Sequence, residues 1–331
     1  FGFIFVHDPE TLKSNLMKKI MLSFTAVLFC VSILAQNTTT LKMNLEKNKV
    51  YRLKSVSEQT VTQTMNGVQQ TTESKVLYTM SLKMIDATAD YIITEIHFDT
   101  VQTNTNTMGK LVSYSSVNEG DIKSKETADV LSSIMNRLSK NALYVKMDFT
   151  GKPFEIVNLK MLSDLVLKDT SSITLTGPTA AAVKQQLVNS VSDSELKTMI
   201  ESFTWNLPGK QVSEGDSWKT TQQMSPGGLM LEVTTTYHLD GIEGNNAKLT
   251  VESDVKTAAN ATPIESGGAT VTYDDIKGLG KSSVVVDIRT GLKVEETGKM
   301  HMTGNLGITG PGFSMQMPMD INSESKIISL Q

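Results

Sequence analysis

Alternation of apolar and polar residues is the feature of this sequence that most limits its fold. In residues 76–84 every second side chain is apolar: Val76, Tyr78, Met80, Leu82 and Met84. The same alternation runs through residues 229–240 and 247–256. Because successive side chains of a strand point to opposite faces, each segment has one apolar and one wetted face. This pattern is typical of antiparallel sheets with one covered face. A doubly wound parallel fold would instead need strands that are apolar on both faces.

The middle third of the chain has helical spacing instead. Val130, Ile134 and Leu138 form one apolar stripe, and residues 159–166 and 183–191 predict two further helices. Another helix is expected to start at a capping box, Ser192 with Glu195. The predicted fold class is therefore mainly β (α+β), with long antiparallel strands in a curved sheet or half-barrel. We expect the amphipathic helices to pack on its covered face.

The N-terminal residues predict an export signal. Residues 17–36 combine a basic start, Lys18-Lys19, with an apolar stretch and a small residue near the end, which is typical of a secretory signal peptide. Residues 1–16 are then upstream translation or a misplaced start, and residues 37–331 form a single β-rich body of two lobes, 37–about 140 and about 141–331. Cys30 lies within the apolar stretch and follows Phe29, so we expect no lipid anchor there.

Composition and motifs argue against several functions. The net charge of −4 gives no basic surface for nucleic acid, and the exported part has no segment long and apolar enough to span a membrane. It also has no cysteine, no Gly-x-Ser-x-Gly motif and no phosphate-binding glycine loop. The sequence therefore predicts a protein that is not an enzyme and needs no cofactor.

Five methionines near the C-terminus are the candidate binding residues. Met300 and Met302 share one strand face, and Met315, Met317 and Met319 share a face of the next predicted strand. A hairpin through residues 305–312 would bring the two faces together. Thioethers fill irregular cores, line adaptable apolar binding surfaces and bind copper(I), so all three interpretations stay open. His301 is expected on the opposite face.

Acidic residues on the predicted strands are weaker candidates. Glu296 is in phase with Leu292, Val294, Met300 and Met302, so it would point inward and need a partner. A bulge near Gly298 would instead turn it to solvent, and this is the favoured alternative. Glu95, His97 and Asp99 share one strand face, which is expected to be solvated rather than a metal site.

Two short segments resemble known families. Val212-Ser213-Glu214-Gly215-Asp216-Ser217-Trp218 resembles the Val-x-x-Gly-Asp-x-Trp box of a secreted Bacteroidetes-type family of unknown function. That resemblance implies a β-rich secreted protein and no catalytic residues. Asp287-Ile288-Arg289-Thr290-Gly291-Leu292 is similar to the Asp-x-x-Thr-Gly-Leu hairpin of periplasmic lipoprotein carriers, whose half-barrels hold acyl chains; here Lys293 replaces the proline that follows. Residues 145–152 and 285–292 also resemble each other.

Together these features predict a non-catalytic exported protein of the cell envelope. Its place would be the periplasm, the outer envelope or the exterior, and its partner an apolar or lipid-like molecule held between sheet and helices. The residues proposed for this face are Met300, Met302, Met315, Met317, Met319 and Glu296. Two alternatives remain: a structural or protein-interaction module with a filled core, and copper handling by the methionine strands.

Overall fold

The computed structural model describes residues 38–65, 67–175, 180–204, 207–225, 228–266 and 268–330. The predicted upstream segment 1–16, the predicted signal peptide 17–36 and Cys30 lie outside the described residues. Residues Thr39–Gln331 form one compact unit. The division of this unit into two lobes stays a prediction.

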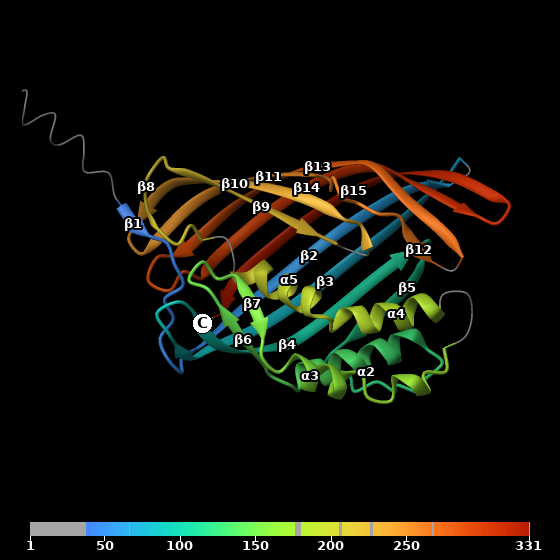
Figure 1. The fold of residues 1–331 in the computed structure, drawn as a ribbon, viewed down its shortest axis with the longest axis horizontal. Coiled ribbons are helices and arrows are strands. Elements are labelled where there is room, and N and C mark those ends of the chain that lie inside the picture. Colours follow the sequence, from blue (N-terminus) through green and yellow to red (C-terminus); the bar gives the residue numbers. More distant parts are fainter. Residues whose placement is uncertain are drawn as a thin grey trace, which may run out of the picture. The chain divides into compact units, whose positions relative to one another are not determined.

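One large antiparallel sheet makes up most of the compact unit (Figure 1). Its thirteen strands follow the order β7-β6-β4-β3-β2-β15-β14-β13-β11-β10-β9, with β5 paired to β4 and β12 to β13. The small strands β1 (Thr38–Thr40) and β8 (Gln211–Ser213) pair with each other. The other strands are β2 (Val50–Met65), β3 (Val68–Ala87), β4 (Ile92–Thr107), β5 (Lys110–Ser115), β6 (Leu143–Met147), β7 (Pro153–Ile156), β9 (Ser217–Met224), β10 (Leu231–Glu243), β11 (Asn246–Thr257), β12 (Ile264–Ser266), β13 (Ala269–Asp287), β14 (Lys293–Gly310) and β15 (Phe313–Leu330).

The sheet joins the two ends of the chain. Its central pair is β15 and β2, in which Ile321 lies opposite Val61 and Ile327 opposite Ser55. On either side the strands follow one another as meanders, and the sheet is open, with β7 and β9 at the ends of its path. The predicted fold class, mainly β with a large antiparallel sheet and a few helices, is confirmed.

The middle third supplies the helices. They are α2 (Thr127–Ser139), α3 (Leu159–Val166), α4 (Ala180–Ser190) and α5 (Asp193–Thr204), with a short 3-10 helix at Thr170–Ser172. At α5 the backbone N–H of Glu195 donates to Ser192 Oγ at 3.3 Å, which is one half of the predicted capping box. Helix α2 contacts β4 and β5, α3 and α4 contact α2, and α5 contacts α4 and β7 (Figure 1).

None of the helices in the described ranges has both the length and the apolar character needed to cross a membrane.

The helices and the inner face of the sheet share one apolar core, which we call the helix-packed cluster. Its fully buried members include Phe98 and Leu82 of the sheet and Ile134 and Phe203 of the helices. The outer face of the sheet is polar and carries cross-strand ion pairs, such as Lys299 with Glu324 at 2.6 Å. Each strand thus has the two faces that its alternation predicts.

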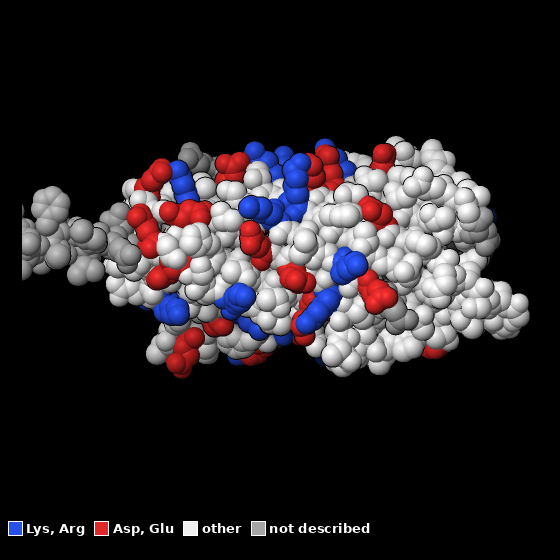
Figure 2. Space-filling model, turned by 90° about the horizontal axis from the view of Figure 1, so that it is seen from above, with Lys and Arg blue, Asp and Glu red and all other residues white. Residues whose placement is uncertain are grey.

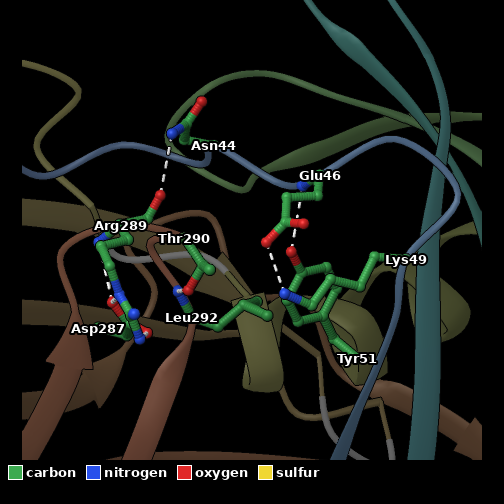
Figure 3. A network of polar contacts seen from close by, with 8 residues as sticks. All are labelled: Asn44, Glu46, Lys49, Tyr51, Asp287, Arg289, Thr290 and Leu292. Carbon is green, nitrogen blue, oxygen red and sulfur yellow. Dashed lines mark hydrogen bonds and ion pairs between the residues drawn. The ribbon is translucent and has the colours of Figure 1, made fainter.

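Two similar hairpins, β6–β7 and β13–β14, form hydrogen bonds with the segment 41–46, which precedes β2. In each of them an aspartate side chain, Asp148 or Asp287, accepts a backbone N–H two residues later. The segment donates from Met43 N to Phe149 O at 2.8 Å and from Asn44 N to Thr290 O at 2.9 Å. Figure 3 shows the second hairpin, where the Asn44 side chain also donates to Arg289 O at 2.9 Å. The side chains of Leu41, Met43 and Leu45 are buried, so this segment contributes directly to the helix-packed cluster.

Candidate functional site

A second apolar cluster occupies the inner face beyond the helices, and we call it the methionine cluster. Its buried members are Leu231, Val233, Val255, Tyr273, Ile276, Met319 and Ile321. Its partly buried members are Val61, Met224, Leu229, Met230, Ala261, Ile264, Met300, Met302 and Leu306. Among these described residues, more are partly exposed than buried, and none belongs to a helix. The cluster is therefore an apolar surface that is only partly covered.

The structure brings together three of the five predicted methionines. Met300, Met302 and Met319 belong to the cluster, whereas Met315 is half-buried and Met317 is buried outside it. The hairpin β14–β15 forms as expected. Its register, however, places Met302 opposite Ile321 and Met319 opposite Gly304, so no two of the five are cross-strand partners. Met224 and Met230, which the sequence did not single out, complete the cluster.

Glycines in β13 make room for the methionines of β14. Gly278 lies opposite Met302 and Gly280 opposite Met300. A Cβ on Gly280 would lie 3.2 Å from the Met300 terminal methyl carbon, and one on Gly278 would collide with Met302. The two flexible side chains therefore lie across the backbone of the neighbouring strand. Because Met has three rotatable bonds, this surface can adapt its shape.

A belt of small residues separates the two clusters on the inner face. It consists of one row of cross-strand partners, Ser57, Ser325, Gly298 and Ser282. In the next row Met300 lies between Ser323 and Gly280, and Ser253 lies beyond Gly280. Cross-strand partners lie on the same face, so small residues make up most of both rows. The inner face is therefore not one continuous apolar layer.

Glu296 points inward, at the border of the helix-packed cluster. Lys293 Nζ lies 2.8 Å from Glu296 Oε2, and the two side chains are 7% and 17% exposed. Lys293 also donates to Ser202 O at 2.8 Å. The favoured alternative, a bulge near Gly298 that turns Glu296 to solvent, is wrong because Gly298 pairs regularly with Ser282.

The irregularity lies on the other side of Glu296. Val286 pairs with Lys293 and Val285 with Glu295, which leaves Val294 as the extra residue, 36% exposed. Val294 is therefore out of phase with Met300, contrary to the prediction. This bulge turns Lys293 inward, so that the carboxylate gains the partner that a buried charge needs. Sequence spacing could not show this, because one inserted residue reverses the alternation.

Trp218 and Tyr237 stack beside this ion pair, with ring centroids 5.3 Å apart. Burial raises the pKa of Tyr237 to about 12; hydrogen bonds with Thr220 and Thr235 act against this, and the Glu296 carboxylate adds to it. The two rings and the ion pair line a small cavity together with apolar residues of β11 and β13 and with Thr204 of α5, and its volume is about 30 Å³. That is the room of about one water molecule, so the core at this point is filled.

The box that precedes Trp218 forms a turn. Gly215 has a φ of +89°, and Asp216 Oδ2 accepts the Ser213 N–H at 2.8 Å. Glu214 Oε1 accepts the Ile242 N–H at 2.8 Å, which ties the turn to β10. The box is thus a chain reversal that places the Trp218 ring at the start of β9.

Glu95, His97 and Asp99 lie on the outer face and divide between two sets of partners. Glu95 pairs with Lys83 at 2.9 Å and contacts His97 at 3.3 Å, and the hydrogen bond from Lys83 lowers the pKa of Glu95. Asp99 is an extra residue in β4 and accepts from Ser81 at 3.0 Å. Across the described part of the chain, no group of three or more His, Cys, Asp and Glu residues could hold a metal ion.

A shallow hollow of about 1070 Å³ crosses the outer face over β9 to β2. Its lining mixes both signs of charge, and Lys256–Glu232, Lys281–Glu252 and Lys299–Glu324 are cross-strand pairs around it. His301 points to this face, as expected, and contacts Asp320 at 2.9 Å. The paired charges favour a solvated surface over a site for one class of ligand.

These features define a β-rich protein whose open antiparallel sheet carries helices on one part of its inner face and a partly exposed methionine cluster on another. The chain belongs to the family of unknown function DUF6263, whose model matches residues 88–293. The match includes the helices, Trp218 and Lys293, and it ends before Met300. The expected membership of a family of unknown function is thus confirmed; the Bacteroidetes assignment and the role of the box stay predictions.

Similarity to other proteins is remote. Among curated proteins, none matches this sequence. An outer membrane channel from Pseudomonas putida F1 is 9% identical, with a TM-score of 0.24 over 87% of this chain and 97% of that one. OccK11 (OpdR) from Pseudomonas aeruginosa is 5% identical, with a TM-score of 0.23 over 87% of this chain and 99% of its own. Scores of this size do not indicate a common fold.

Proposed function

We propose that this chain is a non-catalytic exported protein of the cell envelope that binds an apolar, lipid-like molecule on the methionine cluster. The observation that carries the proposal is that more of the cluster's described members are partly exposed than buried, and that none of them belongs to a helix. When a ligand covers an apolar surface that is partly open to water, the free energy of the system falls. Methionine side chains suit such a ligand because they adjust to its shape.

We place the proposed site on the methionine cluster and not in the space between sheet and helices. The cavity next to α5 holds about 30 Å³, whereas pockets for small molecules usually measure ~300 Å³ or more. Met300, Met302 and Met319 remain the central residues, and Met224 and Met230 join them. Glu296 belongs to the ion pair at the border of the helix-packed cluster, so it is not part of the proposed ligand surface.

Export is supported by the sequence alone. Residues 17–36 have the features of a signal peptide, and the compact unit starts at Thr39. Cleavage after residue 35 or 36 would therefore leave the compact unit complete. Mass spectrometry of the mature N-terminus from the native cell envelope tests this point.

Ligand binding is tested by two measurements. Native mass spectrometry of protein extracted gently from its own envelope should show an added apolar mass. Titration with the fluorescent dye anilinonaphthalene sulfonate should then give binding that weakens about tenfold in Met300→Gln/Met302→Gln, because a polar amide replaces apolar surface. The matched control is Met84→Gln/Met199→Gln, two methionines partly buried against the helix-packed cluster. Equal weakening in both variants, or no bound mass and no dye binding, contradicts the proposal.

The filled core beside the helices favours the first alternative, a structural or protein-interaction module, for that part of the molecule. A native protein without any bound apolar mass would extend this interpretation to the methionine cluster. Copper handling requires that copper(I) binds and that Met317→Leu abolishes the binding. Titration of both forms distinguishes it from the other two functions.

A further inference from the structure

The hairpin turns at one end of the sheet form a distinct surface. In the order β4-β3-β2-β15-β14 the strands alternate in direction, so the turns β2–β3, β4–β5 and β14–β15 lie at the same end. We call the three turns together the hairpin tips. Figure 1 shows them on the right, away from the helices α3 and α5.

The segments of β2, β3, β4, β14 and β15 next to the hairpin tips carry no charge. Residues 59–72, 100–109 and 302–319 contain no Asp, Glu, Lys, Arg or His. Figure 2 shows the result, because the right-hand end of the view is almost entirely white. The turns at the opposite end of the sheet are charged, with pairs such as Lys47–Asp86 and Arg289–Asp287. The difference is not a general property of the chain, in which 20% of the residues are charged.

Large apolar side chains stand exposed at each hairpin tip. The exposed fractions are 60% for Val68, 70% for Met108, 67% for Leu111 and 48% for Phe313. They belong to three different turns, and Lys110 is the only charged residue within four positions of any of them in the sequence. Exposed apolar groups elsewhere, such as Leu279 and Val50, have charged residues on both sides in the sequence.

We propose that the hairpin tips dock onto the surface of an uncharged lipid bilayer. Apolar side chains on separate protrusions suit a bilayer, because lipids fill the gaps between them; a protein partner needs one contiguous patch. Residues 59–72, 100–109 and 302–319 contain no acidic side chain, so these segments avoid the cost of taking a carboxylate into the interface. They also carry no basic cluster that would attract anionic lipids. Lys110, between Met108 and Leu111, is long enough to keep its ammonium group at the headgroups.

The proposal does not rest on ligand binding by the methionine cluster, so the two can fail separately. The test uses the full chain with Cys30→Ser and one new cysteine labelled with a polarity-sensitive fluorophore. Gln69→Cys and Ser314→Cys report on the hairpin tips, and Asn245→Cys reports on the opposite end of the sheet; all three positions are exposed. Because every labelled protein carries the same N-terminal apolar stretch, membrane attachment through that stretch affects all three equally.

With phosphatidylcholine vesicles that contain a quencher in their acyl chains, the labels at 69 and 314 should be quenched and the label at 245 should not. The variant Val68→Glu/Leu111→Glu/Phe313→Glu should lose the quenching, with a partition coefficient at least about tenfold lower. The control variant Val50→Glu/Met161→Glu/Leu279→Glu changes three other exposed apolar side chains and should keep it.

Three results would overturn the proposal. The tip labels could stay unquenched, which would leave the hairpin tips outside the bilayer. Quenching could occur only in vesicles with phosphatidylglycerol and disappear at high salt, which would show electrostatic binding elsewhere. The tip labels could also respond to protein concentration without vesicles and lose that response in the tip variant, which would identify a second copy of the chain as the partner.

Discussion

The helix-packed cluster and the methionine cluster lie on the same face of one sheet and differ in how they are completed. The helix-packed cluster includes residues of α2 to α5 and of the segment 41–46, and most of its members are buried. None of the described members of the methionine cluster belongs to a helix, and most of them stay partly exposed. The comparison teaches that alternation makes an apolar face but does not determine what covers it.

The largest loss of stability should follow truncation of a buried aromatic side chain in the helix-packed cluster. Phe203→Ala removes a fully buried side chain from α5 and leaves a cavity in the helix-packed cluster. The free energy of unfolding should fall by about 3–5 kcal/mol. Urea denaturation followed by circular dichroism measures it. A loss below about 1 kcal/mol would contradict the tight packing described for this cluster.

The second largest loss of stability should come from breaking the ion pair between Lys293 and Glu296 at the border of the helix-packed cluster. Lys293→Met leaves the Glu296 carboxylate inside without a partner, which should cost about 3 kcal/mol. In Lys293→Met/Glu296→Met no charge remains, so most of the loss should be recovered. Urea denaturation of the two variants gives the comparison. If both variants are equally unstable, the pair does not act as a unit.

Truncation within the methionine cluster should cost less. Met302→Ala removes a partly exposed, flexible side chain, so we expect a loss of about 1 kcal/mol and little change in folding cooperativity. Met80→Ala, at a fully buried methionine of the helix-packed cluster, is the matched control and should lose at least about 2 kcal/mol. Similar losses in both would remove the distinction between the clusters.

The smallest effect should be the loss of stability when acid protonates Asp287, the partner of Arg289. A hydrogen bond from Arg289 lowers the pKa of Asp287, at the charged end of the sheet. A lowered folded-state pKa means that the pair stabilises the fold above the unfolded-state value of about 3.9, and that this contribution disappears as the pH falls through the folded-state pKa. The stability difference between the native chain and Arg289→Ala should therefore shrink below about pH 4. A difference that is unchanged down to pH 2 would contradict this.

The sequence predicts strands and helices well because their periods are local. The alternation in 229–240 and 247–256 reappears as the inward faces of β10 and β11, and the stripe Val130, Ile134, Leu138 is the buried face of α2. Strand order is different, because the pattern in β2 does not say that β15 will lie beside it. That pairing depends on long-range contacts, which one sequence does not display.

The candidate site was predictable only in part. Met300, Met302 and Met319 do share a face, since their spacing of two is local information. The bulge at Val294 could not be foreseen, and with it the inward position of Lys293 and its partnership with Glu296. The only signal was a lysine directly after Thr290-Gly291-Leu292, where the similar carriers have proline. The positions of Met224, at the end of β9, and Met230, just before β10, depend on how the sheet curves.

Methionine oxidation tests the central claim, that the methionine cluster is an accessible apolar surface and the helix-packed cluster is not. The folded protein would be treated with hydrogen peroxide in the absence of denaturant, and each sulfoxide quantified by peptide mass spectrometry. We predict that Met300 and Met302 oxidise rapidly and that Met43 and Met80 react only on the time scale of global unfolding. If Met300 and Met302 are protected as strongly as Met80, the methionine cluster is closed and the account is wrong.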